Sequence, residues 1–85
     1  MAISFVQMKM ARGGLSLTVR EMADLTGVSH DTVGRIERGE QLKGSTLEKV
    51  RKALENIGLV IIGDDGIRIP KAAIDAAVKK VDNNP

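Results

Sequence analysis

The sequence predicts a mainly α-helical fold, in which four short helices are followed by a β-hairpin and a last helix. Three observations lead to this prediction. Residues 18–39 hold two short helical patterns, each opened by a hydroxyl side chain and closed by a glycine. Residues 45–57 hold a further helical stripe of apolar side chains. From residue 59 onward the apolar period shortens to that of a strand, and it lengthens again after residue 70.

Length and composition restrict the class of protein. The chain has 85 residues and one aromatic side chain, Phe5, so we expect a small aliphatic core of marginal stability. It has no cysteine, which excludes disulfides and thiolate metal sites and fits a reducing cytoplasm. No apolar run reaches the roughly 18 residues that a membrane span requires, and residues 1–14 lack the apolar core of a signal peptide. We therefore expect a cytoplasmic protein without a metal, a cofactor or a membrane partner.

The first helix is expected to begin at Ser4 or its neighbours and to fray at Gly13 and Gly14. Leu15 and Leu17 then lead into the second helix. The apolar pattern of the first helix predicts inward-facing side chains at Phe5, Val6 and Met10.

The second helix begins at Thr18, because Thr18 and Glu21 have the spacing of a capping box. Gly27 ends it, since glycine takes the left-handed conformation at a helix end without steric cost. Ser29 caps the third helix, and Gly39 ends it. The apolar side chains of these two helices are Met22, Ala23, Leu25, Val33 and Ile36.

The spacing within this stretch is typical of a helix-turn-helix motif. Ala23 lies four residues before Gly27, and Val33 and Ile36 lie six and nine residues after it. The small residue lets the two helices approach, the glycine makes the turn, and the β-branched pair docks the second helix on the first. The alternative interpretation is a small helical bundle in which these residues serve packing alone.

The fourth helix follows a polar loop, residues 40–44, in which Leu42 is expected to be an anchor. Ser45 and Glu48 have the spacing of a second capping box, and Gly58 ends the helix. Its apolar stripe comprises Leu47, Val50, Ala53, Leu54 and Ile57.

Residues 59–69 predict a β-hairpin, because a β-branched run (59–62) and an alternating stretch (67–69) flank a Gly-Asp-Asp-Gly turn at 63–66. Pro70 suits the first position of a last helix that runs from Lys71 to about Val81. The tail, residues 82–85, is expected to be frayed. One face of the last helix would carry Ile74, Ala77, Val78 and Val81.

Residues 17–40, LTVREMADLTGVSHDTVGRIERGE, followed by STLEKVRKAL, are similar to the XRE (Cro and lambda-repressor-like) DNA-binding family. The similarity covers roughly Met10 to Leu54. It implies a lambda-repressor-like four-helix DNA-binding domain over residues 1–58, with the third helix in the major groove. It also implies that Arg38 contacts phosphate and that the base-reading residues are Ser29, His30, Asp31, Gly34 and Arg35.

The chemistry of these side chains agrees with that role. Arg35 can bind the O6 and N7 atoms of guanine, Asp31 can accept from cytosine N4, and His30 can donate or accept. Gly34 would let the helix lie close to the bases. The alternatives are that His30 is a solvated residue at a helix start, that Asp31 only complements the helix dipole, and that Arg35 pairs with Glu37 or Asp31. Glu37 itself is expected to pair with a basic residue of an earlier helix.

Phosphate contacts are expected at the starts of the second and fourth helices, where backbone N–H groups and the helix dipole favour anions. Where the family often carries Gln, this chain has Val19 followed by Arg20. Either Arg20 takes over the anchoring, or the second helix contributes its backbone alone. The predicted phosphate-binding residues are Thr18, Arg20, Thr32, Arg38, Lys43, Ser45 and Thr46.

The net charge of +2 arises within residues 1–58, which hold nine Lys or Arg and seven Asp or Glu, whereas residues 59–85 hold four of each. The basic side chains gather from the third helix onward, as a nucleic-acid footprint requires. An ordinary solvated surface is the alternative interpretation of the charge.

Residues 59–85 are expected to form a dimerisation extension, because an isolated two-stranded hairpin is marginally stable and needs a cover. A second copy of the chain would provide that cover. The alternative is that the last helix covers the hairpin or closes the core of a monomer. The predicted dimer contacts are Val60, Ile62, Ile67, Ile69, Ile74, Val78 and Val81.

These observations favour a DNA-binding transcriptional regulator, most simply a repressor that binds a palindromic double-stranded operator as a homodimer. The alternative is an antitoxin-type module that neutralises a partner protein and regulates its own operon. With one histidine, no cysteine and scattered acidic residues, the sequence offers no catalytic constellation. It also offers no aromatic platform for single-stranded nucleic acid.

Overall fold

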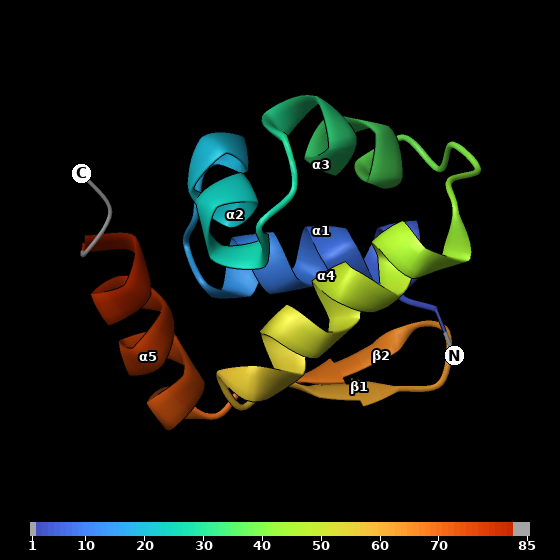
Figure 1. Cartoon of the computed structure of the whole chain (residues 1–85). Helices are drawn as coiled ribbons and strands as arrows, with labels where there is room; N and C mark the ends of the chain where they lie inside the picture. The colour runs from blue at the N-terminus through green and yellow to red at the C-terminus, as the bar shows by residue number, and fades with distance from the viewer. Residues whose placement is uncertain (1, 83–85) are drawn as a thin grey trace.

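The computed structural model describes residues 2–82, which form five α-helices and one two-stranded antiparallel sheet (Figure 1). Asp82 was predicted to begin a frayed tail but is instead the last residue of the last helix, and the rest of that predicted tail, residues 83–85, lies outside the described part. The elements are α1 (Phe5–Gly14), α2 (Val19–Thr26), α3 (His30–Glu37), α4 (Gly44–Asn56), β1 (Val60–Ile62), β2 (Gly66–Arg68) and α5 (Lys71–Asp82).

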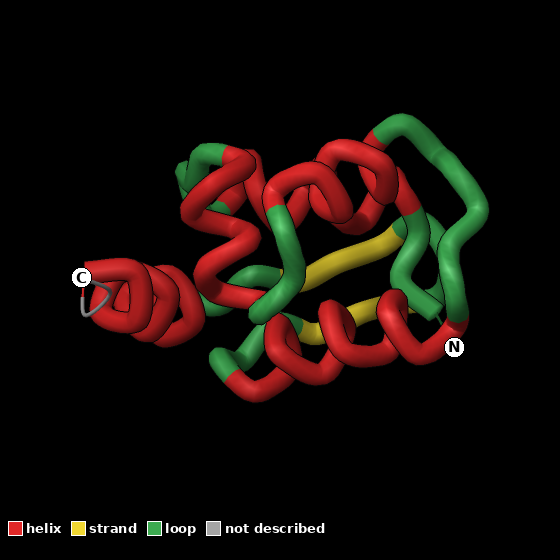
Figure 2. Tube along the Cα trace, turned by 45° about the horizontal axis from the view of Figure 1, so that its top comes forward, coloured by secondary structure: helices red, strands yellow, loops and turns green. Residues whose placement is uncertain are grey.

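The helices α1 and α4 lie between the α2–α3 pair and the hairpin (Figure 1). Both cartoon views place α5 at the opposite end of the molecule from the hairpin turn (Figures 1 and 2). Aliphatic and thioether side chains from α1 to α4 fill the space between these layers, as the nearly aromatic-free composition requires. The largest apolar side chains buried there are Met8, Met22, Val33, Val50 and Leu54.

The inward face of α1 differs from the predicted one. Ser4 caps the helix and forms a capping box with Gln7, and the buried residues are Gln7, Met8 and Ala11. Phe5 is 47% exposed, so its predicted burial is wrong. Helical geometry explains this, because positions 7, 8 and 11 share one face and positions 5, 6 and 10 lie on its flanks or behind it. The ring of Phe5 instead lies beside the end of α3, and the two half-buried predicted residues are Val6 and Met10.

The start of α4 also differs from the prediction. The helix begins at Gly44 with Lys43 as its N-cap, and no side chain caps it. The N–H groups of Thr46 and Leu47 donate to the carbonyl of Lys43 at 3.1 and 3.2 Å, which places Ser45 inside the first turn. A capping residue must precede the helix with extended backbone angles, so the predicted capping box of Ser45 is wrong.

Left-handed glycines end α3 and α4 in the same way. Gly39 has φ +80°, its N–H donates to Ile36, and the next residue, Glu40, donates to the carbonyl of Arg35. Gly58 has φ +110° and is followed by the equivalent bond from Leu59 to Leu54. These paired bonds form the Schellman motif, which folds the chain back over the last helical turn.

The hairpin has a three-residue turn, because Gly66 pairs with Ile62 as the first residue of β2 and not, as predicted, as part of the turn. Ile61 and Ile67 form a cross-strand pair that packs against the core, whereas Val60 and Ile62 are exposed on the other face. The inner face lies against α1 and α4, and α5 packs on α2. The cover that the hairpin requires therefore comes from the first and fourth helices.

A buried amide holds the hairpin turn against α1. The side-chain Nε2 of Gln7 lies 3.2, 2.8 and 2.9 Å from the carbonyl oxygens of Ile62, Gly63 and Gly66. Its Oε1 accepts from the N–H of Ser4, and the Ser4 hydroxyl donates to the carbonyl of Asp64. Gln7 is fully buried, so its side-chain amide, in place of water, provides the donor for these carbonyl groups.

The last helix begins where it was predicted, directly after Pro70, whose carbonyl accepts from Ala73 and Ile74. Its buried residues are Ala73 and Ala77, and Val78 is 47% exposed. The predicted single face is therefore wrong at Val78, because the small alanines are what let α5 approach the rest of the core. A Cβ on Gly58 would lie 3.4 Å from the Cβ of Ala73, which illustrates how close this approach is.

Candidate nucleic-acid interface

The α2–turn–α3 unit has the local structure that its residues predict. Thr18 and Glu21 form a capping box, and Gly27 ends α2 in a left-handed conformation with φ +78°. Ser29 caps α3 by accepting from the N–H of Thr32. The predicted docking residues, Ala23, Val33 and Ile36, are all buried.

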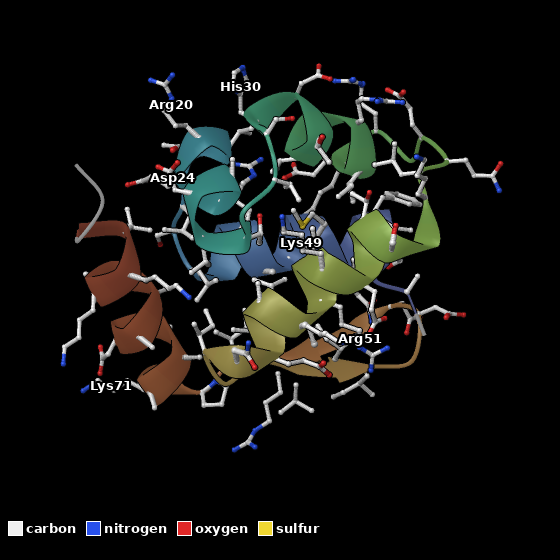
Figure 3. All side chains as sticks on the ribbon, in the orientation of Figure 1. Arg20, Asp24, His30, Lys49, Arg51 and Lys71 are labelled. Carbon is white, nitrogen blue, oxygen red and sulfur yellow. The ribbon has the colours of Figure 1, made fainter. Side chains whose placement is uncertain are left out.

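Burial of Val33 and Ile36 turns the other side of α3 outward. His30 and Asp31 are exposed at its first turn, and Gly34 and Arg35 are half-buried one turn later. His30 and Arg20 project from α3 and α2 toward the same side of the molecule, away from α1 and α4 (Figure 3). The structure therefore brings the predicted base-reading residues onto one polar face, with Arg20 beside it.

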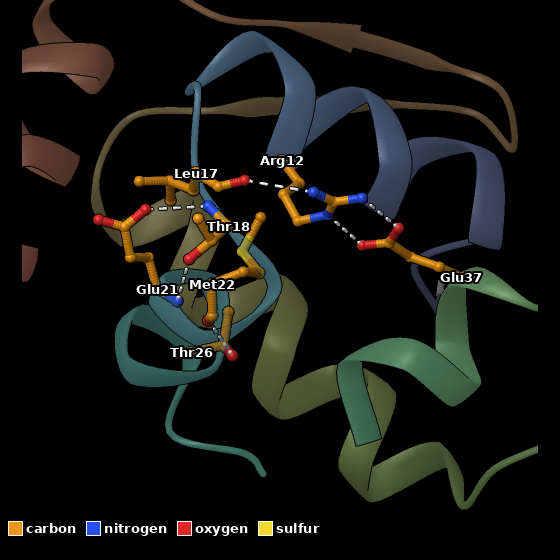
Figure 4. A network of polar contacts seen from close by, with 7 residues as sticks. All are labelled: Arg12, Leu17, Thr18, Glu21, Met22, Thr26 and Glu37. Carbon is orange, nitrogen blue, oxygen red and sulfur yellow. Dashed lines mark hydrogen bonds and ion pairs between the residues drawn. The ribbon is translucent and has the colours of Figure 1, made fainter. Parts of the chain in front are cut away.

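An ion pair between Arg12 and Glu37 connects α1 to α3 (Figure 4). The Arg12 guanidinium donates to both Glu37 oxygens at 2.7 and 2.9 Å, and it also donates to the carbonyl of Leu17 at 3.3 Å. The hydrogen bond to Glu37 raises the pKa of Arg12, burial opposes that rise, and the Glu37 charge adds to it. The Glu37 side chain is only 11% exposed. The prediction that Glu37 pairs with an earlier helix is confirmed, and the pair sets the position of α3 on the core.

Arg35 of α3 and Arg38, the C-cap of that helix, share one carboxylate. Arg35 Nε donates to Glu40 Oε1 at 3.1 Å, and Arg38 Nε donates to Glu40 Oε2 at 3.0 Å. The Arg38 Nη2 atom lies 2.9 Å from the same oxygen, as part of the ion pair. The alternative that Arg35 pairs with Glu37 or Asp31 is wrong. Glu37 is held by Arg12 on the core side, whereas Glu40 is folded back over the end of α3.

A hollow of about 380 Å³ lies between α3 and the start of α4. The absence of a side-chain cap leaves the first turn of α4 open for an anion, and that turn carries no acidic residue. The hollow brings base-reading and phosphate-binding candidates together, with Gln41 as a residue that sequence reasoning missed. Its lining comprises Thr32, Arg35, Gln41, Leu42, Lys43 and Thr46.

The start of α2 is more occupied than the start of α4. The Thr18 N–H donates to the Glu21 carboxylate at 2.9 Å, and the Glu21 N–H donates to the Thr18 hydroxyl at 3.1 Å. A phosphate at this helix end would meet the Glu21 carboxylate. Arg20, one residue earlier, is exposed and is the cation nearest in sequence to this end.

A larger hollow of about 720 Å³ lies between α2, α4 and α5 and includes Ser45, which is thus on the other side of α4 from the first hollow. Lys49 crosses from α4 to donate to the carbonyl of Gly27 at 2.9 Å, and so supports the turn between α2 and α3. The positive charge of the lysines that line this hollow is partly offset by acidic side chains. The charged residues that line it are Asp24, Glu48, Lys49, Lys52 and Lys80.

The seven predicted dimer contacts divide into two groups. Val60, Ile62 and Val78 are 44%, 53% and 47% exposed. The other four are half-buried and pack against the core of their own chain, namely Ile67, Ile69, Ile74 and Val81.

The described residues hold no group of three or more His, Cys, Asp or Glu side chains that could bind a metal ion. Within residues 2–82, none of the helices has the length and apolarity that crossing a membrane demands.

The comparisons with known proteins agree with this geometry. A family model described as helix-turn-helix matches residues 8–61, which is more than half of the chain. No curated protein and no solved structure matches the chain. The matched span includes the whole of α2, α3 and α4. The family comprises DNA-binding regulators and is not an enzyme family. The chain therefore belongs to the XRE-type helix-turn-helix family of DNA-binding transcription regulators.

Proposed function

We propose that this regulator is a repressor that binds a palindromic double-stranded operator as a homodimer, with α3 in the major groove. The observation that supports this most directly is the polar face of α3. Ser29, His30 and Asp31 lie at the end of the helix that enters the groove in this architecture, and Gly34 and Arg35 follow one turn later. Arg35 would read guanine, and the half-sites would lie about one helical turn apart.

Phosphate groups would bind on both sides of that face. Arg20 projects beside α3, and Lys43 and Thr46 line the hollow at the uncapped start of α4. Thr18, Thr32, Arg38 and Ser45 complete the proposed set of phosphate contacts. Cations and helix N-termini of this kind hold a protein in register on the duplex without reading its sequence.

Dimerisation through residues 59–85 is part of the same proposal. Val60 and Ile62 form an exposed apolar strip on the outer face of the hairpin, and Val78 is an exposed large apolar residue of α5. Burial of such side chains between two copies would add about 25 cal/mol per Å² of apolar surface. The cytoplasm is the proposed location, since DNA is the proposed partner.

A second candidate function is an antitoxin-type module that binds a partner protein. The observation that favours it is the exposure of Phe5 on α1, on the opposite terminal element from Val78. Aromatic side chains are enriched at protein interfaces, so an exposed phenylalanine in a chain with no other aromatic residue fits a partner contact.

Selection of duplexes from a random library at two salt concentrations would test the proposal. A palindromic consensus that persists at the higher salt supports a dimeric operator-binding regulator. Arg35→Ala should then cost roughly 1–3 kcal/mol on the selected duplex and little on random DNA. Binding that disappears as salt rises, without any consensus, would contradict the proposal and leave phosphate attraction alone. Copurification with a partner would then favour the antitoxin-type function.

A further inference from the structure

Glu40 occupies a position that the backbone determines. Because Gly39 is left-handed, the chain turns back at the end of α3, and the N–H of Glu40 donates to the carbonyl of Arg35 at 3.1 Å. This bond places the side chain of Glu40 over the last turn of α3, beside the outward arginines. The loop that carries Glu40 continues into the hollow at the start of α4.

The carboxylate of Glu40 uses both oxygens on those arginines, one for Arg35 and one for Arg38. All three side chains remain 42% exposed or more, and exposed ion pairs contribute little to folding stability. The hydrogen bonds from Arg35 and Arg38 lower the pKa of the Glu40 carboxyl below its ordinary value. The cluster of Arg35, Arg38 and Glu40 therefore affects mainly the surface charge beside α3 and the orientation of the two arginine side chains, and contributes little to folding stability.

Gly34 makes room for this arrangement. A Cβ at Gly34 would lie 3.2 Å from Nη1 of Arg38, which shows that the Arg38 guanidinium folds back along α3 to reach Glu40. In this position one negative charge stands between two positive ones. The face then carries a net charge of +1 at these three residues in place of +2.

We propose that Glu40 is a specificity-determining residue, which orients Arg35 for base reading and offsets the attraction of Arg35 and Arg38 for phosphate. The proposal rests on the function proposed above. Phosphates are present in every duplex, so a carboxylate beside them weakens binding to all sequences. Orientation of Arg35 strengthens binding only where the matching base is present, because a preordered side chain loses less freedom on binding. The two effects together widen the ratio between operator and random DNA.

The test compares Glu40→Gln with Glu55→Gln in the full chain. Glu55 is a matched control, because it also pairs with an arginine, Arg51, at 3.3 Å, and its replacement changes the net charge equally. Glu55 is the second-last residue of α4. The end of α4 lies away from α3 (Figure 1). Affinities for the selected operator and for a random duplex would be measured over a range of salt concentrations, with thermal unfolding of both variants.

Glu40→Gln is expected to raise affinity for the random duplex about eightfold at 0.1 M salt and to steepen its log–log salt slope by about 0.9, the effect of one further phosphate contact. Affinity for the operator should rise less, so the specificity ratio falls. Glu55→Gln should leave that ratio unchanged, and both variants should unfold at similar temperatures. Removal of Arg38 as well, in Arg38→Gln/Glu40→Gln, should abolish the gain on random DNA.

An unchanged specificity ratio in Glu40→Gln, or a gain on random DNA that survives in the double variant, would overturn the role of Glu40 while leaving the proposed function intact. A native chain that prefers no duplex would instead overturn the proposed function, and this inference with it. The native measurement alone separates the two cases.

Discussion

The helix-turn-helix motif and the hairpin are held in place by different kinds of contact. In residues 18–39 the helix ends are set by Thr18, Ser29, Gly27 and Gly39, each acting within five residues of its partner. The hairpin turn is instead held by Gln7, more than 50 residues away in the chain. Local contacts can be recognised in a sequence, whereas a contact between distant segments depends on the assembled fold.

The largest expected effect tests the distant contact. Gln7→Leu should lower the free energy of unfolding by about 3 kcal/mol, because it leaves the carbonyls of Ile62, Gly63 and Gly66 without their buried donor. Urea denaturation would measure the loss, and hydrogen exchange should show it first at the hairpin. The matched control is Lys9→Leu, at an exposed position of the same helix, with an expected change within about 0.5 kcal/mol. A loss below about 1 kcal/mol for Gln7→Leu would mean that Gln7 is not the main anchor.

A smaller effect tests the local contacts. Ser29→Ala should cost about 1 kcal/mol of folding free energy, since it removes the cap of α3. Ser45→Ala should cost less than about 0.5 kcal/mol, because Ser45 lies inside the first turn of α4 and caps nothing. Thermal or urea unfolding of both variants would measure the difference. Equal costs would contradict the position of Ser45 and restore the capping box that the sequence predicts.

The smallest effect joins stability to the proposed function. Gly34→Ala should raise the free energy of unfolding by about 0.5 to 1 kcal/mol, because alanine is the better helix former. The added methyl group would push the Arg38 guanidinium aside and stand between α3 and the bases. Operator affinity should therefore fall while stability rises, as duplex binding and denaturation of one sample would reveal. A variant that gains stability and keeps full affinity would indicate that α3 does not approach the bases closely.

The predicted site, like the fold, has features that the local sequence indicates and features that only the folded chain shows. The apolar pair Val33 and Ile36 predicted which face of α3 turns outward, and Glu37 was predicted to pair with a basic residue of an earlier helix. The partner of Arg35 was not, because Glu40 reaches it only after Gly39 reverses the chain. A signal was present in the sequence, since a glycine at a helix end places the following residue beside the last helical turn.

Phe5, Val78 and Ser45 were assigned wrongly for a common reason. An apolar side chain or a capping pattern shows which role a residue could have in the fold. Packing against neighbouring elements decides which residue has that role. The polar Gln7 took an inward position of α1 because three carbonyls in and beside the hairpin turn accept from its side-chain amide. Alanines took the inward face of α5 because only small side chains allow the close approach seen at Gly58.

The sequence by itself determined the helix-turn-helix motif, its two capped helices and its left-handed glycine ends, because these depend on hydrogen bonds and backbone angles within a few residues. The tertiary structure alone decided how the hairpin is anchored and at which residue α4 begins, so that its first N–H groups have no side-chain cap. It also decided which carboxylate pairs with Arg35 and Arg38. Those features depend on distances between segments that come together only when the core forms. Local conformational preference fixes the elements, and burial against neighbours selects the face that each one turns toward the core.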